Sequence, residues 1–384
     1  MDKYMYWLDN VPRLGWEAKC RLLEAFQTPE NVYLASEKYL KYVLEEKKVK
    51  AVLSAQKSWD VEECFDTLTR KGIQMITITE EGFPQKLKNI PDPTFALYYL
   101  GQLPREDFPS VAVIGARECS EYGSYIAGEL GKCLGQNHIQ VISGMARGID
   151  GISQSAALEA GGCSYGIMGC GVDICYPASN RALYDRLCRE GGILSTYPPG
   201  TEPRSQLFPP RNRIVSGLAD VLVVVEARQK SGTSITVEMA LEQGRDIYAV
   251  PGRITDRLSD GCNQLLRDGA HVFLSPRDFV EELKQLLPVK MENLLKKNKI
   301  GIQASLPDQI NENQGKSTKP YVLSEKILAV LDYYPQHVDT LVDKLKNLYD
   351  QEVSVTELNI ALMELSLKDL VKQQLPGWFT KGDS

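Results

Sequence analysis

The middle of the chain alternates between short apolar runs and segments of helix length. The runs rich in apolar residues are 111–114, 140–142, 165–168, 193–195, 221–225 and 247–250. Continuous apolar runs are typical of strands that are buried on both faces, and helix-length segments between them allow parallel pairing. The pattern predicts an α/β fold: an extended Rossmann-like parallel sheet with helices on both faces. Two further runs, 73–79 and 95–100, predict accessory strands beside this sheet.

Residues 1–65 have a different pattern, with apolar residues at helical spacing in 17–26 and 36–44 and no strand pattern between them. This predicts a small helical module. Residues 11–15, Val-Pro-Arg-Leu-Gly, resemble a degenerate helix-hairpin-helix or sterile-alpha-motif element. Because glycine is common in turns between helices, we interpret this segment as structural rather than as a DNA-binding hairpin.

The C-terminal part begins with a polar stretch that predicts a flexible linker over residues 288–319. Three amphipathic helices and a small hairpin follow, which predicts a winged helix over 320–384. Its presumed reading helix carries Glu357 and Glu364 but only Lys368 as a basic residue, which favours contact with a partner protein over a DNA groove. The predicted domains are therefore 1–65, 70–287 and 320–384, with the linker between the last two.

The composition of the chain argues against several classes of protein. The chain has 384 residues, 43% hydrophobic and 24% charged, and contains no apolar run of 18 residues, so we expect a soluble protein without a membrane span. The first ten residues lack the basic and apolar regions of an export signal, which favours a cytoplasmic location. Nine cysteines form no Cys-x-x-Cys motif and three histidines are scattered, so we expect neither a metal nor another cofactor. A net charge of −6 still permits a local basic groove.

Loops rich in glycine, arginine and hydroxyl side chains follow four of the predicted strands. In a parallel sheet these loops meet at the carboxyl edge, where helix N-termini bind anions. A dinucleotide fingerprint would need glycines at the positions of Arg117 and Ser120, so nicotinamide and flavin cofactors are excluded. Arg117, in place of a glycine, supplies a guanidinium suited to a phosphodiester. Asp150 is placed to cap the helix that follows its loop.

An aromatic residue beside arginines in the third loop suits a base stacked next to a bound phosphate. The predicted binding residues for a nucleic-acid strand are Gly115, Arg117, Ser143, Gly144, Arg147, Gly148, Phe208, Arg211, Asn212, Arg213, Ser231, Gly232 and Thr233. Two alternatives stay open. Arg211 and Arg213 can instead pair with Asp220 or Glu226, and Phe208 can be a core residue.

The order and spacing of these motifs resemble the DprA (Smf) family over about residues 83–275. The matching segments are 114–117, 143–150, 169–177, 197–200, 208–217, 226–233 and 244–252. The resemblance implies a homodimer that binds and protects single-stranded DNA without sequence preference, and that loads RecA during natural transformation, with SSB as a further partner. Gln154 and Thr196 depart from the family pattern, which leaves the roles of those two side chains in doubt.

An enzymatic alternative comes from the segment 231–233, which is similar to part of the nucleotide phosphoribohydrolase (lysine-decarboxylase-like) motif. That motif places a catalytic glutamate where this chain has Thr236, and Glu238 falls on a different helix face. No histidine lies among the crevice motifs to activate a nucleophile. We therefore expect a binding protein and not an enzyme.

Overall fold

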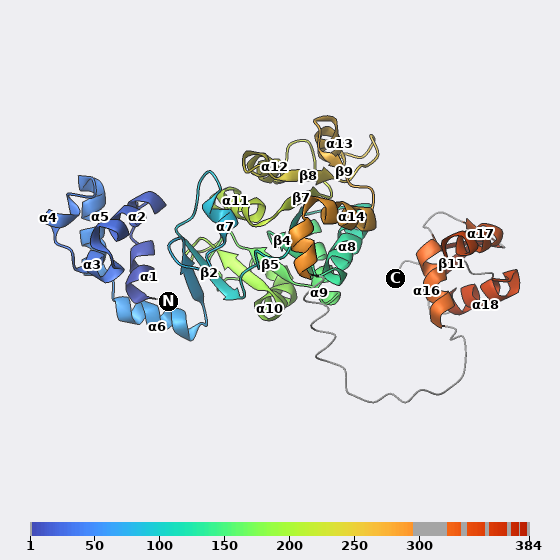
Figure 1. Ribbon diagram of the computed structural model, residues 1–384, viewed down its shortest axis with the longest axis horizontal. Coiled ribbons are helices and arrows are strands. Elements are labelled where there is room, and N and C mark those ends of the chain that lie inside the picture. The colour runs from blue at the N-terminus through green and yellow to red at the C-terminus, as the bar shows by residue number, and fades with distance from the viewer. Residues whose placement is uncertain are drawn as a thin grey trace, which may run out of the picture. The chain divides into compact units, whose positions relative to one another are not determined.

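The computed structural model describes residues 2–294, 321–331, 336–349, 353–366, 370–375 and 377–381. The chain forms two compact units, Met1–Leu306 and Pro307–Ser384 (Figure 1). The first unit contains both the predicted helical module and the predicted α/β domain. The predicted linker starts later than expected, because residues 288–294 are helical and Met291 and Leu294 are buried against the α/β core. The rest of that linker, 295–319, lies outside the described residues.

The six predicted core strands are all present and pair in parallel in the order β6-β5-β4-β3-β7-β8. Their bounds are β3 (Ser110–Ile114), β4 (Gln140–Ser143), β5 (Ser164–Ile167), β6 (Gly192–Ser195), β7 (Val221–Val224) and β8 (Asp246–Ala249). Every residue of these strands is buried except Asp246, which explains why their sequences are mostly apolar. The predicted Rossmann-like sheet is confirmed.

Three short strands extend the sheet to nine. The predicted accessory strands β1 (Gln74–Thr77) and β2 (Ala96–Gly101) pair antiparallel with each other, and β2 pairs antiparallel with β6. At the opposite edge, β9 (His271–Val272) pairs parallel with β8. The apolar pattern did not predict β9, because a two-residue strand with both residues exposed has no periodicity to detect.

Helices cover both faces of the sheet (Figure 1). One face, to which Val111 and Val113 of β3 contribute, packs against α8 (Glu121–Gln136), α9 (Ile149–Glu159) and α14 (Pro276–Leu286). The other face, with Ala112 and Ile114, packs against α7 (Gln85–Lys88), α11 (Phe208–Leu218), α12 (Gly232–Glu242) and α13 (Asp260–Arg267). The helix α10 (Arg181–Glu190) and the 3₁₀ turns Ala178–Asn180 and Ser205–Leu207 complete the domain.

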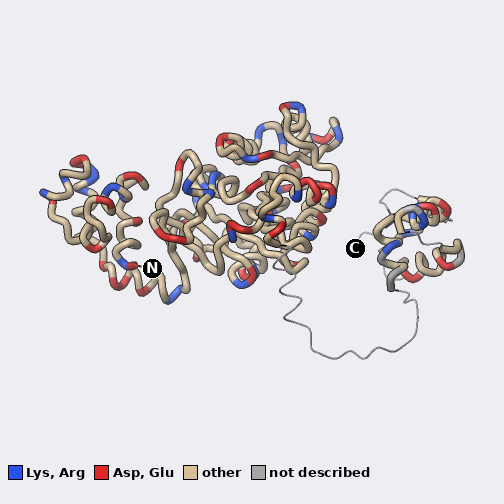
Figure 2. The backbone as a smooth tube through the Cα atoms, viewed as in Figure 1, with Lys and Arg blue, Asp and Glu red and all other residues tan. Residues whose placement is uncertain are grey.

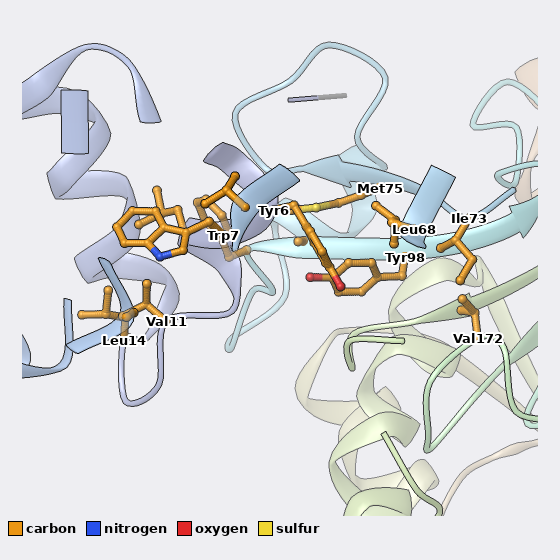
Figure 3. Close-up of a cluster of buried hydrophobic side chains, with 14 of the residues drawn as sticks. Tyr6, Trp7, Val11, Leu14, Leu68, Ile73, Met75, Tyr98 and Val172 are labelled. Carbon is orange, nitrogen blue, oxygen red and sulfur yellow. The ribbon is translucent and has the colours of Figure 1, made fainter. Parts of the chain in front are cut away.

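Six helices precede the sheet: α1 (Lys3–Asp9), α2 (Trp16–Phe26), α3 (Pro29–Leu34), α4 (Glu37–Leu40), α5 (Glu46–Ser58) and α6 (Val61–Arg70). They share one hydrophobic core with the sheet edge, as Figure 3 shows for Tyr6 and Tyr98. These two rings meet edge to face with centroids 6.0 Å apart. The Tyr98 hydroxyl also donates to Asp9 and accepts from the Asn10 side-chain amide at 3.0 Å. The N-terminal helices are therefore packed onto the sheet rather than forming a separate body.

The second unit contains α16 (Tyr321–Val330), β10 (Gln336–His337), α17 (Val338–Tyr349), α18 (Val355–Ser366), β11 (Val371–Leu375) and β12 (Trp378–Lys381). The three strands form an antiparallel sheet in the order β10-β12-β11, and the helices pack around Leu341, Leu358 and Leu362. Its assignment as a winged helix stays a prediction. Among the described residues, no helix has both the length and the apolar character that crossing a bilayer requires.

Candidate nucleic-acid interface

A cavity of about 620 Å³ opens at the carboxyl edge of the sheet, beside the loops that follow β3, β4 and β7. Most of the predicted binding residues line it: Gly115, Arg117, Gly144, Phe208, Arg211, Asn212, Ser231, Gly232 and Thr233. Ser143, Arg147, Gly148 and Arg213 are not among the lining residues. Figure 2 shows Lys and Arg interspersed with Asp and Glu along the chain, so any basic character of the cavity is local.

Arg117 and Arg147 are carried by two loops in direct contact. Gly148 has a positive φ of 72°, and a Cβ there would lie 2.3 Å from the Ala116 carbonyl oxygen. The amide of Ile149 donates to that same oxygen at 3.2 Å. A side chain at residue 148 would therefore push the two loops apart. Both arginines are exposed and have no ion-pair partner within the part of the chain that the structure describes.

Arg211 is buried in the wall of the cavity and does not extend into solvent. Its Nη1 donates to the carbonyl oxygens of Gly144, at 2.9 Å, and Ile167. The Asp150 carboxyl group accepts from the Gly144 amide at 3.1 Å. Gly144 lies between the two side chains, since a Cβ there would be 2.8 Å from both Arg211 Nη2 and Asp150 Oδ2. The structure thus assigns Arg211 and Gly144 a part in shaping the cavity.

Burial affects both charged groups in this wall. It lowers the pKa of Arg211 to about 10, although the nearby Asp150 acts in the opposite direction. It also raises the pKa of Asp150, against the opposing effect of Arg211 and hydrogen-bond donors. Arg211 therefore remains a cation at neutral pH, and it is the charge that compensates Asp150 in the interior.

The alternative partners considered for Arg211 and Arg213 were wrong. Arg213 donates to the Asp92 carbonyl oxygen and lies 3.4 Å from the Asp92 carboxylate, outside the cavity lining. Asp220 instead contacts Lys86 at 2.8 Å and Lys290 at 2.6 Å. Partners this distant in the sequence are fixed by tertiary packing, which a local pattern does not encode.

Phe208 is half-buried at the cavity and is the first residue of α11. Pro209 and Pro210 lie in the first turn of this helix. Prolines fit the first turn of a helix, where their missing amide hydrogens have no intrahelical acceptor. The Phe208 ring lies 5.3 Å from the Tyr176 ring and so close to Gly169 that a Cβ there would be 2.6 Å away. The two rings present a paired aromatic surface to the cavity.

Several lining residues were not among the predicted binding residues, and two of them, Tyr176 and Arg228, have side chains suited to stacking and to phosphate binding. Tyr176 lines the cavity and is 44% exposed, and Arg228 also lines it and is exposed. Tyr176 belongs to a segment that carried the family resemblance, which was the available signal. Arg228 stands three positions before the hydroxyl-rich turn at Ser231, but its exposure depends on how the β7 loop folds.

The N-terminus of α8, expected to bind an anion, is already occupied by Glu226. This buried side chain accepts hydrogen bonds from the Ser120 amide, at 2.9 Å, and from the Ser120 hydroxyl. Gly123 provides the space, because a Cβ there would be 2.3 Å from the Glu226 carboxyl carbon. The carboxyl group compensates the partial positive charge of the helix end, so an external anion is not needed there. Asp150, expected to cap α9, lies inside its first turn, with Gly148 at the cap position.

The N-terminus of α12 is open to the cavity. Ser231 occupies the N-cap position without a side-chain capping bond, and its buried hydroxyl oxygen has no hydrogen-bond partner among the described residues. No atom lies within 4 Å of a Cβ built on Gly232. A free helix end with an unpaired hydroxyl is suited to a phosphate oxygen. Ser143 is different: its hydroxyl is buried and already donates to the Val113 carbonyl oxygen at 2.6 Å, so it is not free to donate to a ligand.

The enzymatic alternative gains no support from the cavity. Thr236 lines it at the position where the phosphoribohydrolase motif has its glutamate, while Glu238 is exposed and is not among the lining residues. Of the acidic side chains that line the cavity, Asp150 is bonded to Gly144 and Glu118 is exposed. Neither combines exposure to a substrate with a partner that would tune it as an acid or base.

Exposed arginines, a paired aromatic surface and one open helix end at the carboxyl edge give this α/β protein a crevice suited to an anionic ligand. A family model described as DNA recombination-mediator protein A matches residues 74–284. The chain is also 30% identical to Protein Smf of Synechocystis, over 97% of each chain. The chain therefore belongs to the DNA recombination-mediator protein A (DprA/Smf) family.

Two solved structures are similar to this one. The X-ray structure of DNA processing protein A from Streptococcus pneumoniae matches 73% of this chain and 98% of its own, with 31% identity and a TM-score of 0.64. A structure of DNA processing protein A from Helicobacter pylori matches 56% of this chain and 96% of its own, with 29% identity and a TM-score of 0.51. The latter concerns the single-stranded DNA binding mode of the Helicobacter protein.

Proposed function

We propose that the chain binds and protects single-stranded DNA without sequence preference, at the cavity on the carboxyl edge of the sheet. The observation that carries this proposal is the pair Arg117 and Arg147, exposed on touching loops and without an ion-pair partner among the described residues. The single-stranded DNA binding mode of the Helicobacter relative supports the same ligand. Loading of RecA for recombination during natural transformation, contact with SSB, a homodimeric state and a cytoplasmic location complete the proposal.

Each part of the cavity has a role in this binding. Arg117 and Arg228 in the cavity, with Arg147 on the adjoining loop, hold phosphates through charge-assisted hydrogen bonds. The N-terminus of α12 with Ser231 receives another phosphate oxygen. Tyr176 and Phe208 offer ring faces on which any base can stack. Arg211 and Gly144 maintain the shape of the wall. Because no contact in this scheme reads a base edge, binding is independent of sequence.

The proposal predicts a preference for single strands and a marked salt dependence. In titrations with labelled oligothymidine and with duplex, we expect tighter binding of oligothymidine. The logarithm of affinity should fall with the logarithm of salt with a slope of about −2, since each of three arginine contacts contributes about −0.7. Equal affinity for duplex, or no dependence on salt, would contradict the proposal.

Phe208→Ala is expected to weaken oligothymidine binding by about 1–3 kcal/mol, because the aromatic pair loses one stacking face. The loss in unfolding free energy should stay below the about 3–5 kcal/mol of a core phenylalanine, since the ring is only half-buried. Affinity and thermal unfolding are measured on the same protein, with Phe208→Trp as a control that can still stack. A destabilised variant that binds normally when folded would assign Phe208 to the core.

A further inference from the structure

A second groove lies in the N-terminal helical region. It has a volume of about 370 Å³ and is lined by Pro12, Arg13, Lys47, Lys50, Ala51, Ser54, Ala55, Ser58 and Trp59. Its floor is one face of α5, where small side chains alternate with serine hydroxyls. The helix α5 carries four lysines, at 47, 48, 50 and 57, against Glu46. The proposed DNA-binding cavity includes none of these residues.

Two cations of the groove are available to a ligand. Arg13 and Lys47 are exposed and have no ion-pair or hydrogen-bond partner in the described part of the chain, whereas Lys50 lies 2.7 Å from Glu46. Arg13 also adopts a φ of 64°, a conformation that costs free energy for a residue with a side chain. It belongs to the turn between α1 and α2, so a strained turn places a guanidinium at the groove.

The lining favours a phosphodiester chain over an acidic peptide. Small residues and hydroxyls let a backbone approach α5 closely, and the serines can donate to phosphate oxygens. Trp59 is the only aromatic residue of the lining and is half-buried, so the groove offers little apolar surface to the side chains of a protein partner. An interface with complementary charge and few apolar contacts is typical of binding to the nucleic-acid backbone.

We propose that this groove is a second contact for single-stranded DNA, in which Arg13 and Lys47 bind backbone phosphates of a strand also held at the sheet edge. The inference rests on the proposed function, and it gives the turn over residues 11–15 a ligand that the sequence analysis had not assigned to it. Short strands fill only the first cavity, whereas longer strands reach both sites. The additional contact therefore raises affinity only for long strands, through effective concentration.

The test uses the full chain and a double variant, Arg13→Gly with Lys47→Ala. Glycine removes the guanidinium while accepting the positive φ, so the turn keeps its conformation. The matched control is Arg21→Ala with Lys57→Ala, which removes the same charge from exposed positions of α2 and α5 outside the groove lining. Thermal unfolding of all three proteins verifies that each is folded.

For a long oligothymidine, we expect the groove variant to bind about ten-fold more weakly than the unchanged protein. Its salt slope should be shallower by about 1.4, since two contacts of about 0.7 each are lost. A short oligothymidine should bind all three proteins equally. Unchanged affinity and slope for the long strand, or an equal loss in the control, would overturn this inference. Failure of the unchanged protein to bind either oligothymidine would instead overturn the proposed function.

Discussion

Arg211→Ala is expected to lower the free energy of unfolding by about 3–5 kcal/mol, the typical cost of leaving a buried charge without a compensating charge. The variant leaves Asp150 buried beside Gly144 without its compensating cation, and it removes the hydrogen bonds that Arg211 donates to the carbonyl oxygens of Gly144 and Ile167. Chemical denaturation measures this loss. Arg213→Ala, in the same helix but outside the cavity, is the control and should cost far less.

The same variant should respond to pH in a defined direction. Arg211 opposes the effect of burial on the pKa of Asp150, so its removal raises that pKa further. A folded-state pKa above the unfolded value makes stability fall as pH rises through the window between the two. Arg211→Ala should therefore be less destabilised at about pH 5 than at about pH 7. If the loss in unfolding free energy is independent of pH, or is smaller than the loss for Arg213→Ala, then Arg211 and Asp150 do not stabilise the cavity wall.

Arg117→Ala and Arg147→Ala should each weaken oligothymidine binding by about 1.5–3 kcal/mol, the worth of a charge-assisted hydrogen bond. Neither should change the unfolding free energy much, because both side chains are exposed and make no ion pair within the described residues. Arg189→Ala, an exposed arginine of α10 that does not line the cavity, is the matched control. Affinity close to that of the unchanged protein in either variant would remove that arginine from the interface.

The six core strands could be predicted from the sequence because they are buried on both faces, so each is rich in apolar residues that the local pattern detects. The attachment of the N-terminal helices to the sheet edge could not be predicted. It depends on contacts such as that between Asp9 and Tyr98, which are 89 positions apart. A contact between residues so far apart cannot be detected from the local periodicity of the sequence.

In the candidate site, too, some features could be predicted from the sequence and others could not. The loops that meet at the carboxyl edge could be predicted from the order of strands and helices. Whether each arginine is exposed, buried or paired could not be predicted. Arg117 and Arg147 are exposed, whereas Arg211 is buried beside Asp150 and Arg213 is bound to Asp92. The residue type is the same in all four cases. What differs is the residue that each arginine contacts in the folded structure, and the sequence alone does not show that contact.

The carboxyl group of Glu226 at the start of α8 also determines which small molecules this fold excludes. In dinucleotide-binding Rossmann folds, the diphosphate occupies the N-terminus of the first helix. Here a diphosphate would meet an acidic side chain of the protein itself, at the place where such a ligand gains most of its affinity. Free nucleotides therefore have little to gain by competing for the crevice, whereas a polymer can distribute its binding over several separate contacts. The proposed binding of a DNA strand rather than a free nucleotide is consistent with a helix end that an intramolecular carboxyl group already occupies.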